Sequence, residues 1–61
     1  MAKRLIEKGG LSEDGTRPLI LHTQDADNRW REDVIERIPD AEADARIQVL
    51  IDNGLVSGVW P

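Results

Sequence analysis

Carboxylates are the side chains best placed to do chemistry in this sequence, which has twelve acidic residues, one histidine and no cysteine. Six of the acids fall within thirteen consecutive residues: Glu32, Asp33, Glu36, Asp40, Glu42 and Asp44. Such a cluster could hold a cation, carry out acid–base catalysis or present negative charge to a basic partner. The neighbouring residues distinguish these three uses.

A calcium loop is the first use to test. Asp25, Asp27 and Glu36 occupy the first, third and twelfth positions of the calcium-loop spacing. Arg29, however, stands where the loop needs an oxygen ligand, and Trp30 stands where it needs glycine for a sharp turn. We therefore exclude a calcium loop and expect no metal ion and no cofactor.

Catalysis lacks its usual combinations of residues. A catalytic histidine needs a nucleophile, a second ligand or an orienting carboxylate. His22 is the sole histidine, and Ser12 and Ser57 lie in turn-forming contexts without a nucleophile motif. Paired carboxylates also need a cleft that separates their pKa values, and a domain of this size has little room for one. We expect a structural or surface role for His22 and no enzymatic activity.

Two helices are predicted on either side of Pro39. In DNRWREDVIERIPD, Trp30, Val34, Ile35 and Ile38 form one apolar stripe at helical spacing, which predicts a helix over about 28–38 with Trp30 in the core. Proline would end that helix.

The segment DAEADARIQVLIDNG repeats apolar residues at helical spacing and predicts the second helix over about 41–52. Asp40 would cap this helix and Glu42 would lie in its first turn. Asn53 and Gly54 would end it, with one of them in the left-handed conformation.

Strands are expected on either side of the two helices. PLILHT is apolar and β-favouring, and LVSGVW is short and apolar, so we predict an antiparallel pair over about 18–23 and 55–60. The predicted fold class is α+β, a short antiparallel sheet packed by two helices. Residues 13–61 would form the single small domain, and residues 1–12 are a candidate mobile N-terminal segment.

The charge distribution limits the kind of partner. The net charge of −4 is concentrated in residues 25–52, where nine acids face four arginines. A DNA-binding protein normally has a basic stripe, so we expect no direct nucleic-acid binding. Because no apolar run is long enough for a membrane span and no leader pattern follows Met1, we expect a cytoplasmic location and no membrane partner.

The acidic cluster suggests a specific function. Acids at this spacing can imitate nucleic-acid phosphates and occupy a basic groove, as small phage inhibitors such as anti-CRISPR proteins do. By analogy with that class, we expect a non-enzymatic inhibitor that binds a basic, nucleic-acid-binding surface of a larger protein. The six acids would supply the charge. Trp60 would be either an apolar anchor in the partner or a lid on the core.

Two alternatives stay open. The predicted order of strand, helix, turn and helix, with RIQVLIDNGLVSG, resembles ribbon-helix-helix antitoxins, which implies a regulator that dimerises through PLILHT. A homodimer therefore remains open. The other alternative is a structural subunit that uses apolar ends to join a larger assembly.

Overall fold

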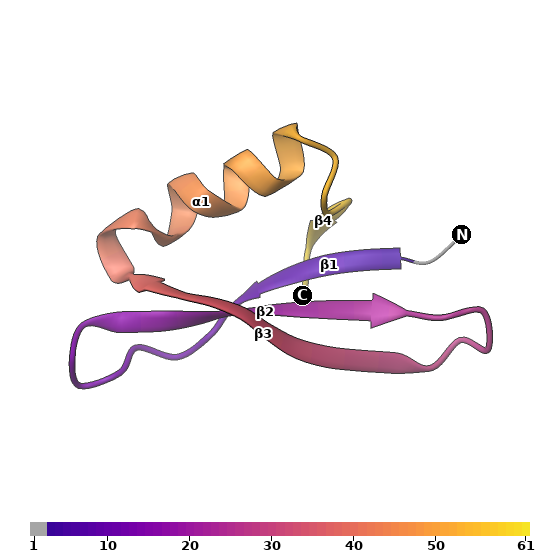
Figure 1. Cartoon of the computed structure of the whole chain (residues 1–61), viewed down its shortest axis with the longest axis horizontal. Helices are drawn as coiled ribbons and strands as arrows, with labels where there is room; N and C mark the ends of the chain where they lie inside the picture. Colours follow the sequence, from indigo (N-terminus) through magenta and orange to yellow (C-terminus); the bar gives the residue numbers. More distant parts are fainter. Residues whose placement is uncertain (1–2) are drawn as a thin grey trace.

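The fold is a four-stranded sheet with one helix on one face (Figure 1). The computed structural model describes residues 3–61. The elements in chain order are β1 Lys3–Lys8, β2 Thr16–Gln24, β3 Trp30–Pro39, α1 Asp40–Asp52 and β4 Gly58–Val59. The strands lie in the order β3-β2-β1-β4, and the molecule is elongated, with extents of 37 × 22 × 17 Å.

The first three strands form an antiparallel meander. Between β1 and β2, Gly15 has a positive φ of 83°, and the Asp14 carboxylate accepts hydrogen bonds from the backbone and the hydroxyl of Thr16. Between β2 and β3, the Asp25 carboxylate accepts from the backbone N–H groups of Asp27 and Arg29. Asp and Asn at these positions close the turns locally, so each strand folds back beside the previous one.

The helix predicted over 28–38 is wrong, because Trp30–Pro39 forms strand β3 and pairs with β2 along its length. Asn28, at the start of the predicted helix, has a φ of 62° in the hairpin turn instead. The apolar stripe was consistent with a helix, but β-branched residues and tryptophan also favour strands. Pairing with β2, which is not local in the sequence, decided between the two. Residues 3–61 therefore contain one helix, and the predicted sheet packed by two helices is incorrect.

The predicted strand over 55–60 is also wrong in extent and partner. Only Gly58–Val59 is a strand, and it pairs in parallel with β1 through Leu5 and Ile6. PLILHT lies within β2, which has β1 on one edge and β3 on the other. It therefore has no free edge for a second chain, and the strand–helix–helix order that suggested a ribbon-helix-helix dimer is not present.

Helix α1 begins at Asp40, directly after Pro39, and so confirms the second helix of the sequence prediction. Asp40 and Glu42 lie in its first turn, where their charges favour the positive end of the helix. Gly54 takes a φ of 72° after the last turn, and Leu55 N–H returns to the carbonyl of Leu50 at 3.0 Å.

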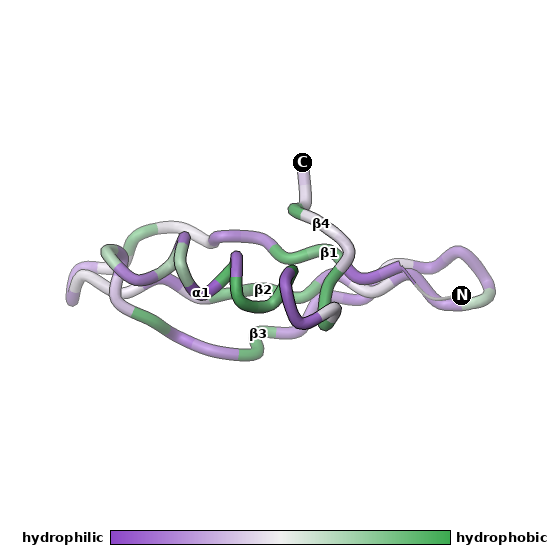
Figure 2. Tube along the Cα trace, turned by 90° about the horizontal axis from the view of Figure 1, so that it is seen from above, coloured by the Kyte–Doolittle hydropathy of each residue, from purple (hydrophilic) through white to green (hydrophobic). Residues whose placement is uncertain are grey.

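The core lies between α1 and one face of the sheet. It consists of Ile6, Leu19, Ile38, Ala43, Ile47, Leu50 and Val56. Ile6 belongs to the segment treated as a candidate mobile terminus, yet it is fully buried in β1; residues 1–2 of that segment lie outside the described residues. Figure 2 shows the hydrophobic stretches in the middle of the strands near α1, and a mostly hydrophilic β2–β3 hairpin tip. The face away from α1 is left without a covering helix.

Candidate functional site

Strand β3 is the edge of the sheet and carries acids on both faces. Residues opposite one another on antiparallel strands share a face. Asp33 and Glu36 pair with Leu21 and Leu19 and therefore lie on the α1 side. Glu32 pairs with His22 and lies on the other face. The two faces of this strand therefore offer different surfaces to a partner.

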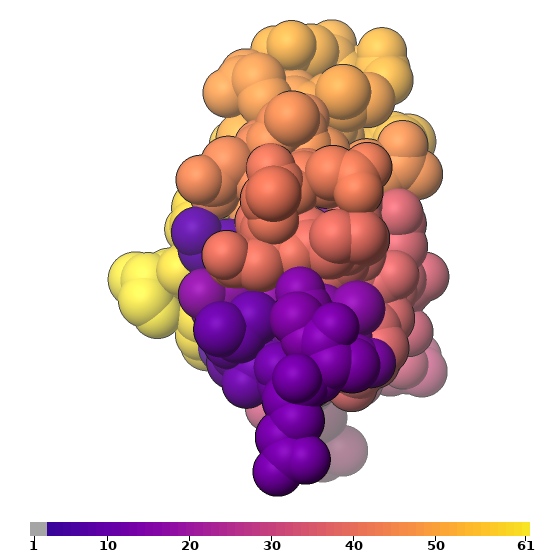
Figure 3. Space-filling model, turned by 90° about the vertical axis from the view of Figure 1, so that its left-hand side faces the viewer, coloured from indigo at the N-terminus to yellow at the C-terminus, as the bar shows by residue number. Residues whose placement is uncertain are grey.

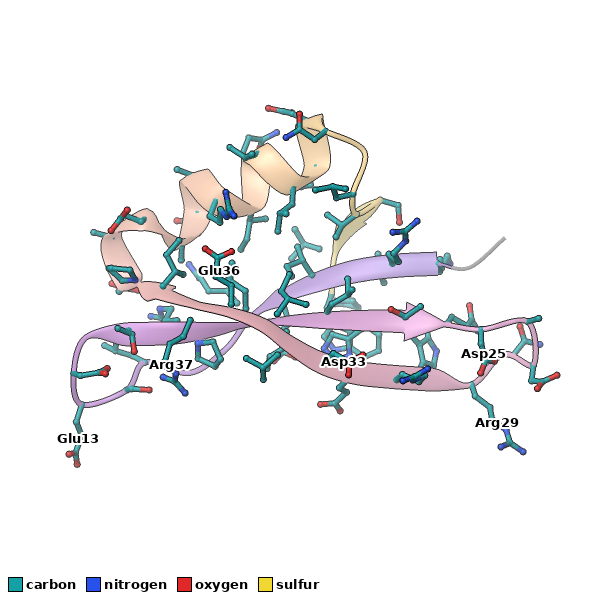
Figure 4. The ribbon with its side chains drawn as sticks, viewed as in Figure 1. Glu13, Asp25, Arg29, Asp33, Glu36 and Arg37 are labelled. Carbon is teal, nitrogen blue, oxygen red and sulfur yellow. The ribbon has the colours of Figure 1, made fainter. Side chains whose placement is uncertain are left out.

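A cleft of about 440 Å³ lies between α1 and β3. Its lining residues are Glu36, Ile38, Glu42, Ala45, Arg46 and Val49. Glu36 points from β3 toward α1 (Figure 4) and accepts a hydrogen bond from Arg46 Nε at 3.0 Å. Glu42 has no ion pair among residues 3–61. The cleft therefore combines an apolar lining with two carboxylates and one arginine, which leaves it one negative charge in excess.

Asp40 and Asp44 are bound to cations from the sheet. Arg17 Nε donates to the Asp40 carboxylate, and Lys8 Nζ lies 2.9 Å from Asp44 Oδ1. The hydrogen bond from Arg17, with its positive charge, holds the pKa of Asp40 below its usual value of 3.8. These two ion pairs link α1 to β2 and β1, and each acid has a cation beside it.

The six acids of the sequence prediction thus do not form one continuous surface. Glu36 and Glu42 share the cleft, whereas Asp40 and Asp44 pair with cations, and Glu32 and Asp33 lie on opposite faces of β3. Glu32, Asp33 and Glu42 are exposed and have no ion pair within residues 3–61. These three and Glu36 are the acids open to a partner.

Trp60 lies on the face of the sheet away from α1. Its ring stacks on His22 with 3.8 Å between centroids and meets Trp30 edge-on at 4.9 Å. Figure 3 shows the C-terminal residues and β3 on opposite sides of the molecule. The Trp60 ring lies over His22 of β2 and there meets Trp30 of β3. Trp60 is partly buried and holds the C-terminal segment in place.

His22 is buried between Glu7 and Trp60. It is 4% exposed, lies under the Trp60 ring, and its Nε2 is 2.6 Å from Glu7 Oε1. A general base must reach a proton on its substrate. Residues 3–61 contain no group of three or more acids or histidines placed to hold a metal ion. The contacts of His22 join β2 to Glu7 of β1 and to the C-terminal Trp60.

Sequence reasoning missed the exposed apolar side chains of β3. Trp30, expected in the core, is 40% exposed, and Val34 and Ile35 are 63% and 44% exposed. Ile38 is the one member of the predicted apolar stripe that is buried. The Asp25–Asn28 turn was the available signal, because an Asp- and Asn-rich turn between two β-favouring segments indicates a hairpin.

Comparisons with protein-family models, curated proteins and solved structures find no match for this chain. Within residues 3–61, α1 is the sole helix, and it is too short and too polar to cross a bilayer.

Proposed function

We propose that this chain is a non-enzymatic protein-binding module that engages a basic surface of a larger protein through β3 and the adjacent side of α1. The cleft carries the proposal, because Glu36 and Glu42 lie there beside the apolar Ile38 and Val49. A lysine or arginine fits such a site by packing its aliphatic stem on the apolar residues while its charge meets the carboxylates.

Exposed apolar side chains give β3 a second surface, on the face away from the cleft. Trp30 and Val34 lie on that face with Glu32 between them, and Ile35 is exposed at the bulge. Exposed apolar side chains flanked by charges are typical of an interface. Trp60 contributes through its edge-on contact with Trp30 and is at most partly available to a partner.

In its most specific form, the proposal is that the module is a cytoplasmic inhibitor and that its partner binds nucleic acid. Glu32, Asp33, Glu36 and Glu42 would then occupy the positions of phosphates, as in the phage inhibitors considered above. Support comes from the exposure of Glu32, Asp33 and Glu42, from the position of Glu36 in the cleft and from the net charge of −4. The arginines 29, 31 and 37 on and beside the same strand limit the size of the negative surface.

The test is affinity capture from cell lysate with wild-type protein and the double variant Glu36→Lys with Glu42→Lys. We expect the variant to lose the captured protein, with affinity weakened by more than about 1 kcal/mol. The matched control is Glu13→Lys with Asp27→Lys, which changes the net charge equally at the two hairpin tips. The control should retain the partner.

Raising the salt concentration separates this function from that of a structural subunit. Binding through exposed charges should fall steeply with salt, whereas burial of Val34 and its apolar neighbours should not. Equal capture by the wild type, the variant and the control would refute the electrostatic mechanism. A captured partner should also lose its own binding of DNA or RNA when the module is added.

A further inference from the structure

The outer edge of β3 is free to accept another strand. β3 stands at one end of the sheet order and has ten residues, whereas the opposite end is closed by the two-residue β4. Seen from above in Figure 2, β3 runs along the outer side of α1, which lies over the sheet. Among residues 3–61, no backbone hydrogen bond reaches β3 from any element other than β2, apart from local turn bonds.

Such an edge exposes N–H and C=O groups at every second residue, and a strand of another chain can pair with them. Proteins usually block long edges with charges, bulges or proline. β3 has all three, since it carries five charged residues, a bulge opposite Leu19 and Ile20, and Pro39 at its end. These features exclude most strands and favour one with complementary charge.

The charges on the α1 side of β3 favour a basic partner strand. Asp33 and Glu36 pair with Leu21 and Leu19 and share that face, whereas Glu32 lies on the other face. Residues directly opposite on neighbouring strands interact, and opposite charges there are stabilising. A strand with basic residues on the α1 side would meet Asp33 and Glu36.

We propose that β3 accepts an extended segment of alternating basic and apolar residues as a fifth strand of the sheet; this rests on the proposed function. Alternate side chains of an added strand point to opposite faces. The basic side chains lie on the α1 side, where they reach Asp33, Glu36 and the cleft. The apolar side chains lie on the other face, beside Trp30 and Val34.

This recognition mode divides affinity and specificity between backbone and side chains. Main-chain hydrogen bonds along the edge supply affinity for any extended segment, and the side-chain surfaces on the two faces select among segments. Glu42 on α1 adds a carboxylate beyond the strand, so the cleft binds one basic side chain of the partner. The bulge bends the edge, and a partner must follow that bend.

The test uses the full chain, labelled with ¹⁵N, and the capped synthetic peptide Lys-Val-Lys-Val-Lys-Val-Lys. We expect binding, with amide exchange slowed at least about tenfold at alternate residues of β3 and little changed in β1. A peptide of the same composition in block order, four lysines followed by three valines, should bind at least about tenfold more weakly. Alternation, not charge alone, is then what β3 recognises.

Two N-methylated peptides test the backbone directly. Methyl groups on the valine nitrogens block one edge of the peptide strand, and methyl groups on the lysine nitrogens block the other. We expect one of the two to lose binding at least about tenfold and the other to keep it, because a single edge faces β3.

The outcomes separate this inference from the proposed function. In one outcome, both methylated peptides bind as well as the unmethylated peptide, and amide exchange in β3 is not slowed. The variant with Lys at positions 36 and 42 nevertheless loses binding. The acidic surface then acts without strand addition, so the inference fails and the proposed function stands. Slowed exchange in β3 that survives this charge reversal would support strand addition and count against the electrostatic mechanism. Absence of peptide binding overturns the inference.

Discussion

Replacing Trp60 with alanine tests whether this side chain belongs to the folded structure or is held outside it for a partner. Its ring stacks on His22 at 3.8 Å with 10° between the ring planes, and it contacts Trp30 edge-on. The backbone N–H of Trp60 also donates to the carbonyl of Ile6 at 2.9 Å. Because the side chain is anchored across β1 and β2, we expect Trp60→Ala to destabilise the protein.

The size of the loss follows from burial and stacking. Partial burial of a tryptophan removes roughly 100–150 Å² of apolar surface from water, which contributes about 2.5–4 kcal/mol at ~25 cal/mol/Å². Compactness of the unfolded chain reduces this by roughly 10–40%, and the aromatic contacts add about 0.5–1.5 kcal/mol per pair. We expect a loss of about 3 kcal/mol, at the lower end of the range for buried aromatic side chains.

That loss is large for a protein of 61 residues, because a domain of this size has a free energy of unfolding of only about 3–9 kcal/mol. Urea denaturation followed by circular dichroism measures it. Trp30→Ala is the matched control, and its loss should be smaller, about 1 kcal/mol, since Trp30 is 40% exposed and makes one edge-on contact.

The double variant completes a thermodynamic cycle, and its coupling energy isolates the contact between the two indoles. A Trp60→Ala variant within about 0.5 kcal/mol of the wild type would refute the reasoning. The side chain would then make no net contribution to the fold, and Trp60 would be free to act as the apolar anchor of an interface.

Two further changes test the loop and the helix start. Gly9→Ala should destabilise the protein by about 1–3 kcal/mol, because its Cβ would lie 2.6 Å from Pro18 Cγ; Gly10→Ala, with no atom within 4 Å, should change the urea midpoint little. Asp40→Asn should lower the urea midpoint at neutral pH. The hydrogen bond and the charge of Arg17 lower the pKa of Asp40, so their ion pair stabilises the fold at pH values above 3.8, the usual pKa of this group. That contribution is lost as the pH falls through the lowered pKa, so the difference between variant and wild type should shrink in acid; a difference independent of pH would exclude the ion pair as its cause.

The helix and its end could be predicted because their determinants are local. Proline before Asp40, the acids of the first turn and Gly54 after the last turn act within a few residues, and α1 follows them. The turn at Asn28 was missed, because residues 28–38 also fit a helix.

Strand β3 could not be assigned from local signals, because its apolar residues are consistent with both a helix and a strand. Val34, Ile35 and Ile38 fall on one side of a helix, but they also favour an extended chain. The choice depends on β2, which offers a complete row of backbone partners to β3 once the turn at Asn28 has formed. That pairing satisfies the backbone groups of β3 that face β2, and it cannot be read from residues 28–38 alone.

The candidate site depends on whether residues 30–39 form a helix, a regular strand or a strand with one extra residue. In a helix, Glu32 and Glu36 would lie on one face, four residues apart. In a regular strand they would again share a face, because side chains alternate with a period of two. The register shift between Leu19 and Ile20 leaves Ile35 as the extra residue of β3, so Glu32 pairs with His22 on one face and Glu36 with Leu19 on the other. The bulge at Ile35 therefore puts Glu36 on the α1 side, where it accepts a hydrogen bond from Arg46 and lines the cleft with Glu42.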